Sequence, residues 1–192
     1  MMRYGKVWFL ALLLGGSLLL APPGSQAGGL DAVKVGAPAP DFTLRDWSSA
    51  QKEHTLSELK GEKVVVLHFG SSSDWGYVKQ IGPMNELYKK FRGKGVAFYT
   101  IYGPETDGKW QPKTDFDRLE RARGLRFAYG LQTHGRMLVP VLADELDNRT
   151  FKAYGETPNS VIIIDKEGKI VSKMANADVK AVEKALKNLV SE

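Results

Sequence analysis

The sequence contains no cysteine, and this absence excludes whole classes of chemistry. Without cysteine the chain forms no disulfide, offers no thiolate nucleophile and holds no metal ion through cysteine sulfur. Histidine is also scarce: the three histidines are His54, His68 and His134, and their spacing matches no metal-binding motif. We therefore expect neither a metal site nor a cofactor.

The sequence also lacks a concentrated block of either charge. It has 27 lysines and arginines against 22 aspartates and glutamates, a net charge of +5. Arg3 and Lys6 fall in the leader predicted below, so the remainder carries 25 basic and 22 acidic residues, or +3. This weak and scattered basicity gives no indication of a nucleic-acid partner.

Residues 1–27 have the pattern of a secretory signal peptide. Arg3 and Lys6 make a basic start, Val7–Leu20 is apolar, and Ser25–Ala27 offers small residues for cleavage. The alternative is an uncleaved membrane anchor, but the apolar run is shorter than the roughly 20 residues that a spanning helix needs. We therefore expect cleavage after Ala27 and a soluble extracytoplasmic domain over residues 28–192, with no membrane attachment after cleavage.

The centre of the chain predicts a strand, a tight turn and a helix. Val64–Phe69 is a continuous apolar run led by β-branched residues, which is typical of a buried central strand. Gly70 ends the run, and Ser71–Asp74 supplies the side-chain oxygens that accept hydrogen bonds at a helix start. Apolar residues then recur at helical spacing, namely Ile81, Met84, Leu87, Tyr88 and Phe91.

The other expected elements give the order β-α-β-α followed by β-β-α. Further strands are expected over residues 41–44, 96–102, 139–143, 160–164 and 170–173, with residues 45–53 as a polar loop. Short helical turns are expected over 55–61, and helices over 115–131, with an interruption at Gly124, over 144–154 and over 178–190. This order predicts an α/β thioredoxin-like fold with a central mixed sheet flanked by helices.

Three segments resemble a known family. Val35–Leu44 resembles the N-terminal signature of redoxins and peroxiredoxins, and Leu67–Tyr77 is similar to the active-site segment of iodothyronine deiodinases. Residues 139–170 are similar to bacterial deiodinase-like redoxins. The resemblance covers nearly all of residues 28–192 and implies an oxidoreductase of the thioredoxin-like superfamily.

The sequence departs from this family at the residues that carry its chemistry. Asp74 stands where the family has its selenocysteine or cysteine nucleophile, Ser72 stands at the neighbouring cysteine, and Tyr77 stands where thioredoxins keep the resolving cysteine. A carboxylate cannot cycle through sulfenic acid, a disulfide or a selenenyl iodide. The favoured interpretation is that Asp74, with Ser72 or Ser73, caps the helix. The alternative makes Asp74 a nucleophile or general base, which needs a partner acid or metal that the sequence does not supply.

The resemblance also places a candidate binding surface. The turn Ser71–Tyr77, with Ser72, Ser73, Trp75 and Tyr77, is expected to face the Thr157–Pro158 loop. Because thioredoxin-like domains carry a cis proline before the hairpin, the resemblance implies a cis bond between Thr157 and Pro158, close to Asp74.

Three functions remain open from the sequence. The leading hypothesis is a redox-inactive, exported member of the family that acts as a binding or accessory module for an unidentified protein or small molecule. The first alternative is an active deiodinase- or peroxiredoxin-like oxidoreductase, and the second is an Asp74-dependent hydrolase or dehalogenase.

Overall fold

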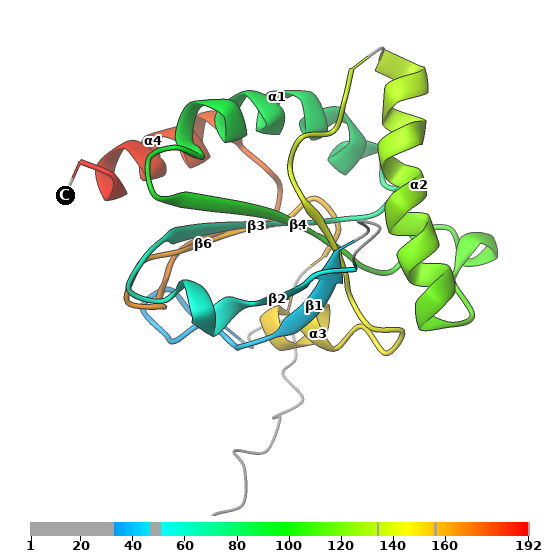
Figure 1. The fold of residues 1–192 in the computed structure, drawn as a ribbon, viewed down its shortest axis with the longest axis horizontal. Helices are drawn as coiled ribbons and strands as arrows, with labels where there is room; N and C mark the ends of the chain where they lie inside the picture. The colour runs from blue at the N-terminus through cyan, green and yellow to red at the C-terminus, as the bar shows by residue number, and fades with distance from the viewer. Residues whose placement is uncertain (1–32, 47–50, 134, 156, 192) are drawn as a thin grey trace, which may run out of the picture.

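A seven-stranded mixed sheet runs through the centre of the molecule (Figure 1). The computed structural model describes residues 33–46, 51–133, 135–155 and 157–191, so the predicted leader over 1–27 lies outside the described residues. The strands are β1 Thr43–Asp46, β2 Glu53–Thr55, β3 Val64–Gly70, β4 Val96–Tyr102, β5 Val141–Ala143, β6 Val161–Ile164 and β7 Ile170–Met174, in the spatial order β2-β1-β5-β4-β3-β6-β7. Strand β4 is parallel to both β3 and β5, and the other neighbours are antiparallel.

Four helices surround this sheet. They are α1 Trp75–Phe91, α2 Asp115–Thr133, α3 Arg149–Tyr154 and α4 Val179–Leu189, with two 3₁₀ turns, η1 Leu56–Leu59 and η2 Gly108–Trp110. Helices α1 and α4 lie together on one face, α3 lies on the other, and α2 stands beside β5 at one end (Figure 1). The predicted central mixed sheet flanked by helices is therefore confirmed.

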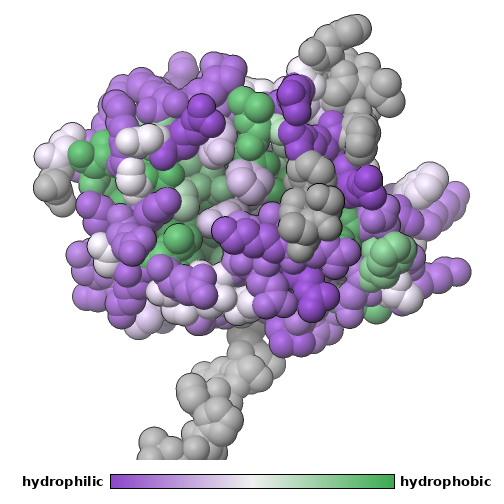
Figure 2. All heavy atoms as spheres, in the orientation of Figure 1, coloured by the Kyte–Doolittle hydropathy of each residue, from purple (hydrophilic) through white to green (hydrophobic). Residues whose placement is uncertain are grey.

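Strand β3 carries the two halves of the core on its two faces. All seven of its residues are buried, as the continuous apolar run predicts. Val65, Leu67 and Phe69 pack with residues of β1, β6 and α3, whereas Val64 and Val66 pack under α1 and α4. Figure 2 shows the core between the sheet and helices α1 and α4 from its edge. Hydrophobic side chains are visible there on an otherwise mostly hydrophilic face.

Three local predictions are wrong in instructive ways. Residues 53–55, expected at the end of a polar loop and the start of helical turns, form β2, because backbone pairing with β1 orders a strand too short to show a periodic pattern. Helix α2 continues through Gly124, where a Cβ would meet no other atom. Helix α3 begins at Arg149 rather than at residue 144, since the Asp144 carboxylate accepts hydrogen bonds from the N–H groups of Thr150 and Phe151 at 3.1 and 3.0 Å.

The N-terminal segment covers the start of strand β7. The Gly36 N–H donates to the Ile170 carbonyl at 2.7 Å, and the Ile170 N–H donates to the Ala37 carbonyl at 2.9 Å. Pro38 and Lys169 form a further antiparallel bridge. Within the described residues, no helix has both the length and the apolar composition needed to cross a membrane.

Gly70 lets the end of β3 pass directly under the start of α1. A Cβ atom at this position would overlap the ring of Tyr77, which is completely buried. We expect Gly70→Ala to lower the free energy of unfolding by about 1–3 kcal/mol, because neither backbone nor ring has space to move in a packed core. Urea denaturation measures this loss.

Gly93→Ala is the matched control, since a Cβ there has no neighbour within 4 Å. The packing explanation fails if the two substitutions change stability equally.

Candidate functional site

Asp74 caps helix α1, as the sequence predicts. Its backbone is extended, with φ −88° and ψ 106°, and its Oδ1 accepts a hydrogen bond from the Tyr77 N–H at 2.5 Å. The helix starts directly after β3 because an acceptor stands where the first free amides of the helix need one. The Asp74 carboxylate therefore has a structural role.

Ser72 and Ser73 do not cap the helix but bind the carboxylate of Glu105. Ser72 Oγ donates to Glu105 Oε1 at 3.1 Å, while the Ser73 N–H and Oγ donate to Oε2 at 3.1 and 2.6 Å. The Tyr102 hydroxyl also donates to Oε1. Glu105 is only 4% exposed, so its carboxylate is buried among these four donors. Burial and the neighbouring Glu105 carboxylate raise the pKa of Tyr102, which keeps this phenol a proton donor.

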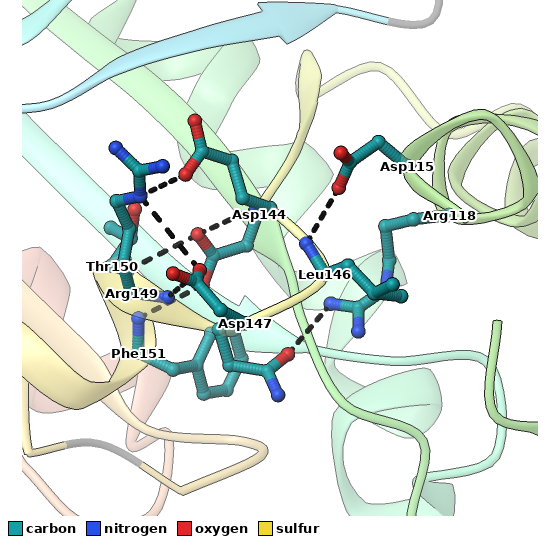
Figure 3. Close-up of polar contacts among 10 residues, drawn as sticks. Asp115, Arg118, Asp144, Leu146, Asp147, Arg149, Thr150 and Phe151 are labelled. Carbon is teal, nitrogen blue, oxygen red and sulfur yellow. Dashed lines mark hydrogen bonds and ion pairs between the residues drawn. The ribbon is translucent and has the colours of Figure 1, made fainter. Parts of the chain in front are cut away.

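A buried cation lies behind this network. Arg118, from α2, is 1% exposed, and its Nη1 donates to Asn148 Oδ1 at 2.9 Å. Figure 3 shows the guanidinium reaching toward the segment between β5 and α3, where Asp144 lies. Burial lowers the pKa of Arg118, while the negative charges of Asp144 and Glu105 act in the opposite direction. Burial also raises the pKa of Asp144, which is 1% exposed. The site thus contains two buried carboxylates near one buried guanidinium.

His68 is a packed strand residue, as expected. Its imidazole is 2% exposed, lies 4.6 Å from the Tyr77 ring between centroids, and shares a hydrogen bond of 3.3 Å with Asn159 Oδ1. Burial lowers its pKa to about 4, although the bond to Asn159 acts in the opposite direction. The Tyr77 hydroxyl shares a hydrogen bond of 3.0 Å with Thr100 Oγ1. Neutral groups therefore fill the space under the first turn of α1.

The predicted cis bond before Pro158 is wrong. No cis peptide bond occurs in the described part of the chain, which includes Thr157 and Pro158. The Ser160 N–H donates to the Thr157 carbonyl at 3.2 Å, and Asn159 has φ 68°, so these residues form a turn with proline second and a left-handed residue third. A trans proline fits the second position of such a turn. The Asn159 N–H donates to the Phe69 carbonyl at 2.7 Å, which fixes the turn at the end of β3.

Of the two aromatic residues predicted for the binding surface, only Trp75 is exposed. Trp75 is 61% exposed, and Lys79 lies over its ring at 5.5 Å. Tyr77 is 0% exposed, so its assignment to a binding surface is wrong, because its ring fills the space above Gly70. A cavity of about 450 Å³ adjoins Ser72 and is lined by Ser72, Asp117, Glu120, Arg121, Gly124 and Leu125. The described residues include no group of three or more histidine and acidic side chains that could hold a metal ion.

Glu105 and Arg118 are the site residues that sequence reasoning missed. Glu105 is an acid in a loop rich in glycine and proline, and nothing in its neighbourhood indicates that it turns inward. For Arg118 a signal exists: it shares one helical face with Ala122 and Leu125, both of which are buried.

Comparison with known proteins assigns this architecture. Residues 35–173 match the AhpC/TSA family. This chain belongs to the AhpC/TSA family. Thiol-disulfide oxidoreductase ResA of Geobacillus thermodenitrificans is similar to this AhpC/TSA chain, with 30% identity over 154 residues that cover 78% of this chain and 76% of that protein. Chloroplastic peroxiredoxin Q of Gentiana triflora is 30% identical over 99 residues, covering 50% and 45% respectively.

Solved structures share the fold of this AhpC/TSA chain. The solution structure of a Bacteroides thetaiotaomicron protein assigned as a disulfide isomerase has a TM-score of 0.65 and 23% identity, covering 83% of this chain and 92% of that one. A thioredoxin-family thiol:disulfide interchange protein from Chlorobium tepidum has a TM-score of 0.60 and 18% identity, covering 82% and 98%. These likenesses confirm the predicted thioredoxin-like fold.

Proposed function

We propose that this AhpC/TSA-family chain is an exported binding or accessory module without redox turnover. The observation that carries the proposal is the hydrogen bond from the Tyr77 N–H to Asp74 Oδ1, which engages the residue that the resemblance places at the family's nucleophile position. The relative ResA is named a thiol-disulfide oxidoreductase. Thiol-disulfide exchange needs sulfur nucleophiles, and this chain has no cysteine. Export rests on the leader pattern of residues 1–27, and membership of the deiodinase-like branch rests on the likeness of Leu67–Tyr77.

The proposed binding surface joins the first turn of α1 to the turn at Thr157–Ser160. A Cβ on Gly76 would lie 3.2 Å from Asp74 Oδ1 and 3.3 Å from Asn159 Nδ2, so the two turns are in contact. Trp75 is the exposed aromatic beside them, and exposed tryptophan is enriched at protein interfaces. A protein or small-molecule partner would therefore meet an aromatic ring flanked by polar groups.

Neither enzymatic alternative gains support from the site. An oxidoreductase would need a nucleophile that the sequence lacks. A hydrolase would need an acid or base acting with Asp74. The nearby carboxylate of Glu105 is instead bound to Ser72, Ser73 and Tyr102.

The proposal predicts no turnover in two assays. We expect the purified protein neither to reduce insulin disulfides nor to consume peroxide with thiol donors, and we expect Asp74→Asn to behave in the same way. Turnover in the parent protein that disappears in Asp74→Asn would instead establish carboxylate chemistry.

Asp74→Cys tests whether this position is still the reactive point of the fold. A thiolate there would accept the Tyr77 N–H and lie at the positive end of the α1 dipole, so its pKa should fall below the free value of about 8.5. The measurement is the alkylation rate as a function of pH. The control is Glu167→Cys, which places a thiol in the exposed turn between β6 and β7. Equal rates and equal titrations for the two thiols would show that the α1 dipole and the Tyr77 N–H do not stabilise a thiolate at position 74.

A further inference from the structure

We propose that the Ser72–Ser73 turn and the Tyr102 hydroxyl form a carboxylate-binding site, which the chain fills with its own Glu105. Four donors from three residues converge on this carboxylate, at 3.1, 3.1 and 2.6 Å for the two serines and with the Tyr102 hydroxyl as the fourth. The serines precede α1 and Tyr102 ends β4, so two separate elements build the site. The inference goes beyond the proposed function and does not depend on it.

Glu105 behaves as a ligand of this turn and not as part of the helix cap. Asp74 already supplies the acceptor for the first turn of α1. Glu105 comes from the loop after β4, 32 residues beyond Ser73 in the chain. The turn therefore holds a second carboxylate that helix capping does not require.

The surroundings favour an anion in this position. The turn stands at the start of the 17-residue helix α1, where the helix dipole is positive. The buried Arg118 guanidinium interacts electrostatically with Glu105. A carboxylate offers about four lone-pair sites, which matches the four donors.

Other contacts hold the loop closed around the site without using the Glu105 carboxylate. The Thr106 N–H donates to Ser73 Oγ at 2.8 Å, and Thr106 Oγ1 donates to the Ser73 carbonyl at 2.9 Å. The Gln111 side-chain amide donates to the Glu105 carbonyl. We therefore expect the donors to remain in place when the carboxylate is removed.

Glu105→Ala removes one methylene carbon and the carboxylate group, which are the heavy atoms of acetate. The experiment titrates the full-length Glu105→Ala variant at neutral pH with sodium acetate, and separately with sodium chloride at equal ionic strength. We expect acetate, and not chloride, to raise the melting temperature and to shift the Ser73 amide signal in NMR spectra, both saturably in the millimolar range. The parent protein should not respond, since Glu105 already fills its site.

Glu105→Gln is the matched control, because its side chain occupies the same space and should exclude acetate. The proposal is overturned if acetate acts on Glu105→Ala no more than chloride does, or acts equally on Glu105→Gln. Should Glu105→Ala not fold without acetate, Glu105→Ser is titrated in the same way. Failure of acetate to bind or refold either variant also overturns the proposal.

Discussion

Replacing Arg118 with methionine should lower the free energy of unfolding by about 1–3 kcal/mol, the range found when a hydrogen-bonding group inside a protein is left without its partner. Methionine keeps most of the apolar volume but removes the cation. Asp144 and Glu105, which are 1% and 4% exposed, then lose their favourable electrostatic interaction with a buried positive charge. The Asn148 side chain also loses the donor that holds it at the start of α3. Urea denaturation at neutral pH measures the loss.

Arg123→Met is the matched control on the same helix. Its side chain is 54% exposed and pairs with Glu120 at 3.7 Å, so solvent screens the interaction. Exposed ion pairs contribute little, and we expect a change within about 0.5 kcal/mol. Comparable losses for the two variants would contradict the assignment of Arg118 as the counter-charge of the buried carboxylates.

Acidification should destabilise the protein through His68. Its pKa is about 4 in the folded chain against 6.5 for an ordinary imidazole, so the unfolded chain binds the extra proton between these values. The stabilisation from the neutral buried ring is therefore complete above about pH 6.5 and is lost as the pH falls toward 4. At 1.36 kcal/mol for each unit, the shift corresponds to about 3 kcal/mol over this window.

The measurement compares the pH dependence of unfolding in the parent protein and in His68→Phe. Phenylalanine occupies similar space without titrating, so its curve should be flatter between pH 6.5 and 4, whatever its stability at neutral pH. His54→Gln is the control. Its stability should depend on pH between 6.5 and 4 as in the parent protein, because the buried imidazole of His68 remains. A parallel curve for His68→Phe would refute this origin of the acid sensitivity.

The parts of the site that could be predicted are those that depend on residues close together in the sequence. The apolar run Val64–Phe69 predicts β3, and Asp74 before a helical pattern predicts a cap, since each signal acts within a few residues. Glu105 reaches Ser73 across 32 positions, and no local pattern encodes that approach. The turn at Asn159 was missed because the resemblance implied another geometry for Pro158, although asparagine tolerates positive φ.

Helix α2 shows how a periodic pattern can assign the wrong face. Leu119 and Ala122 are apolar marks of this helix in the sequence, but Leu119 is only partly buried. Arg118 takes the buried position one residue earlier, beside Ala122 and Leu125. Arginine is rarely buried on a core face, and here it donates a hydrogen bond to Asn148 and interacts electrostatically with the buried acids Asp144 and Glu105. Only the folded chain brings those acids together.

The backbone bonds between residues 36–38 and the start of β7 bear on how the protein behaves at high concentration. An unpaired strand margin is a template on which another chain can extend the sheet and begin to aggregate. Here the chain covers part of one margin itself, and the opposite margin, β2, is only three residues long. A recombinant version that starts after Pro38 would uncover the start of β7, so a truncated protein for crystallisation or NMR should begin no later than Val33.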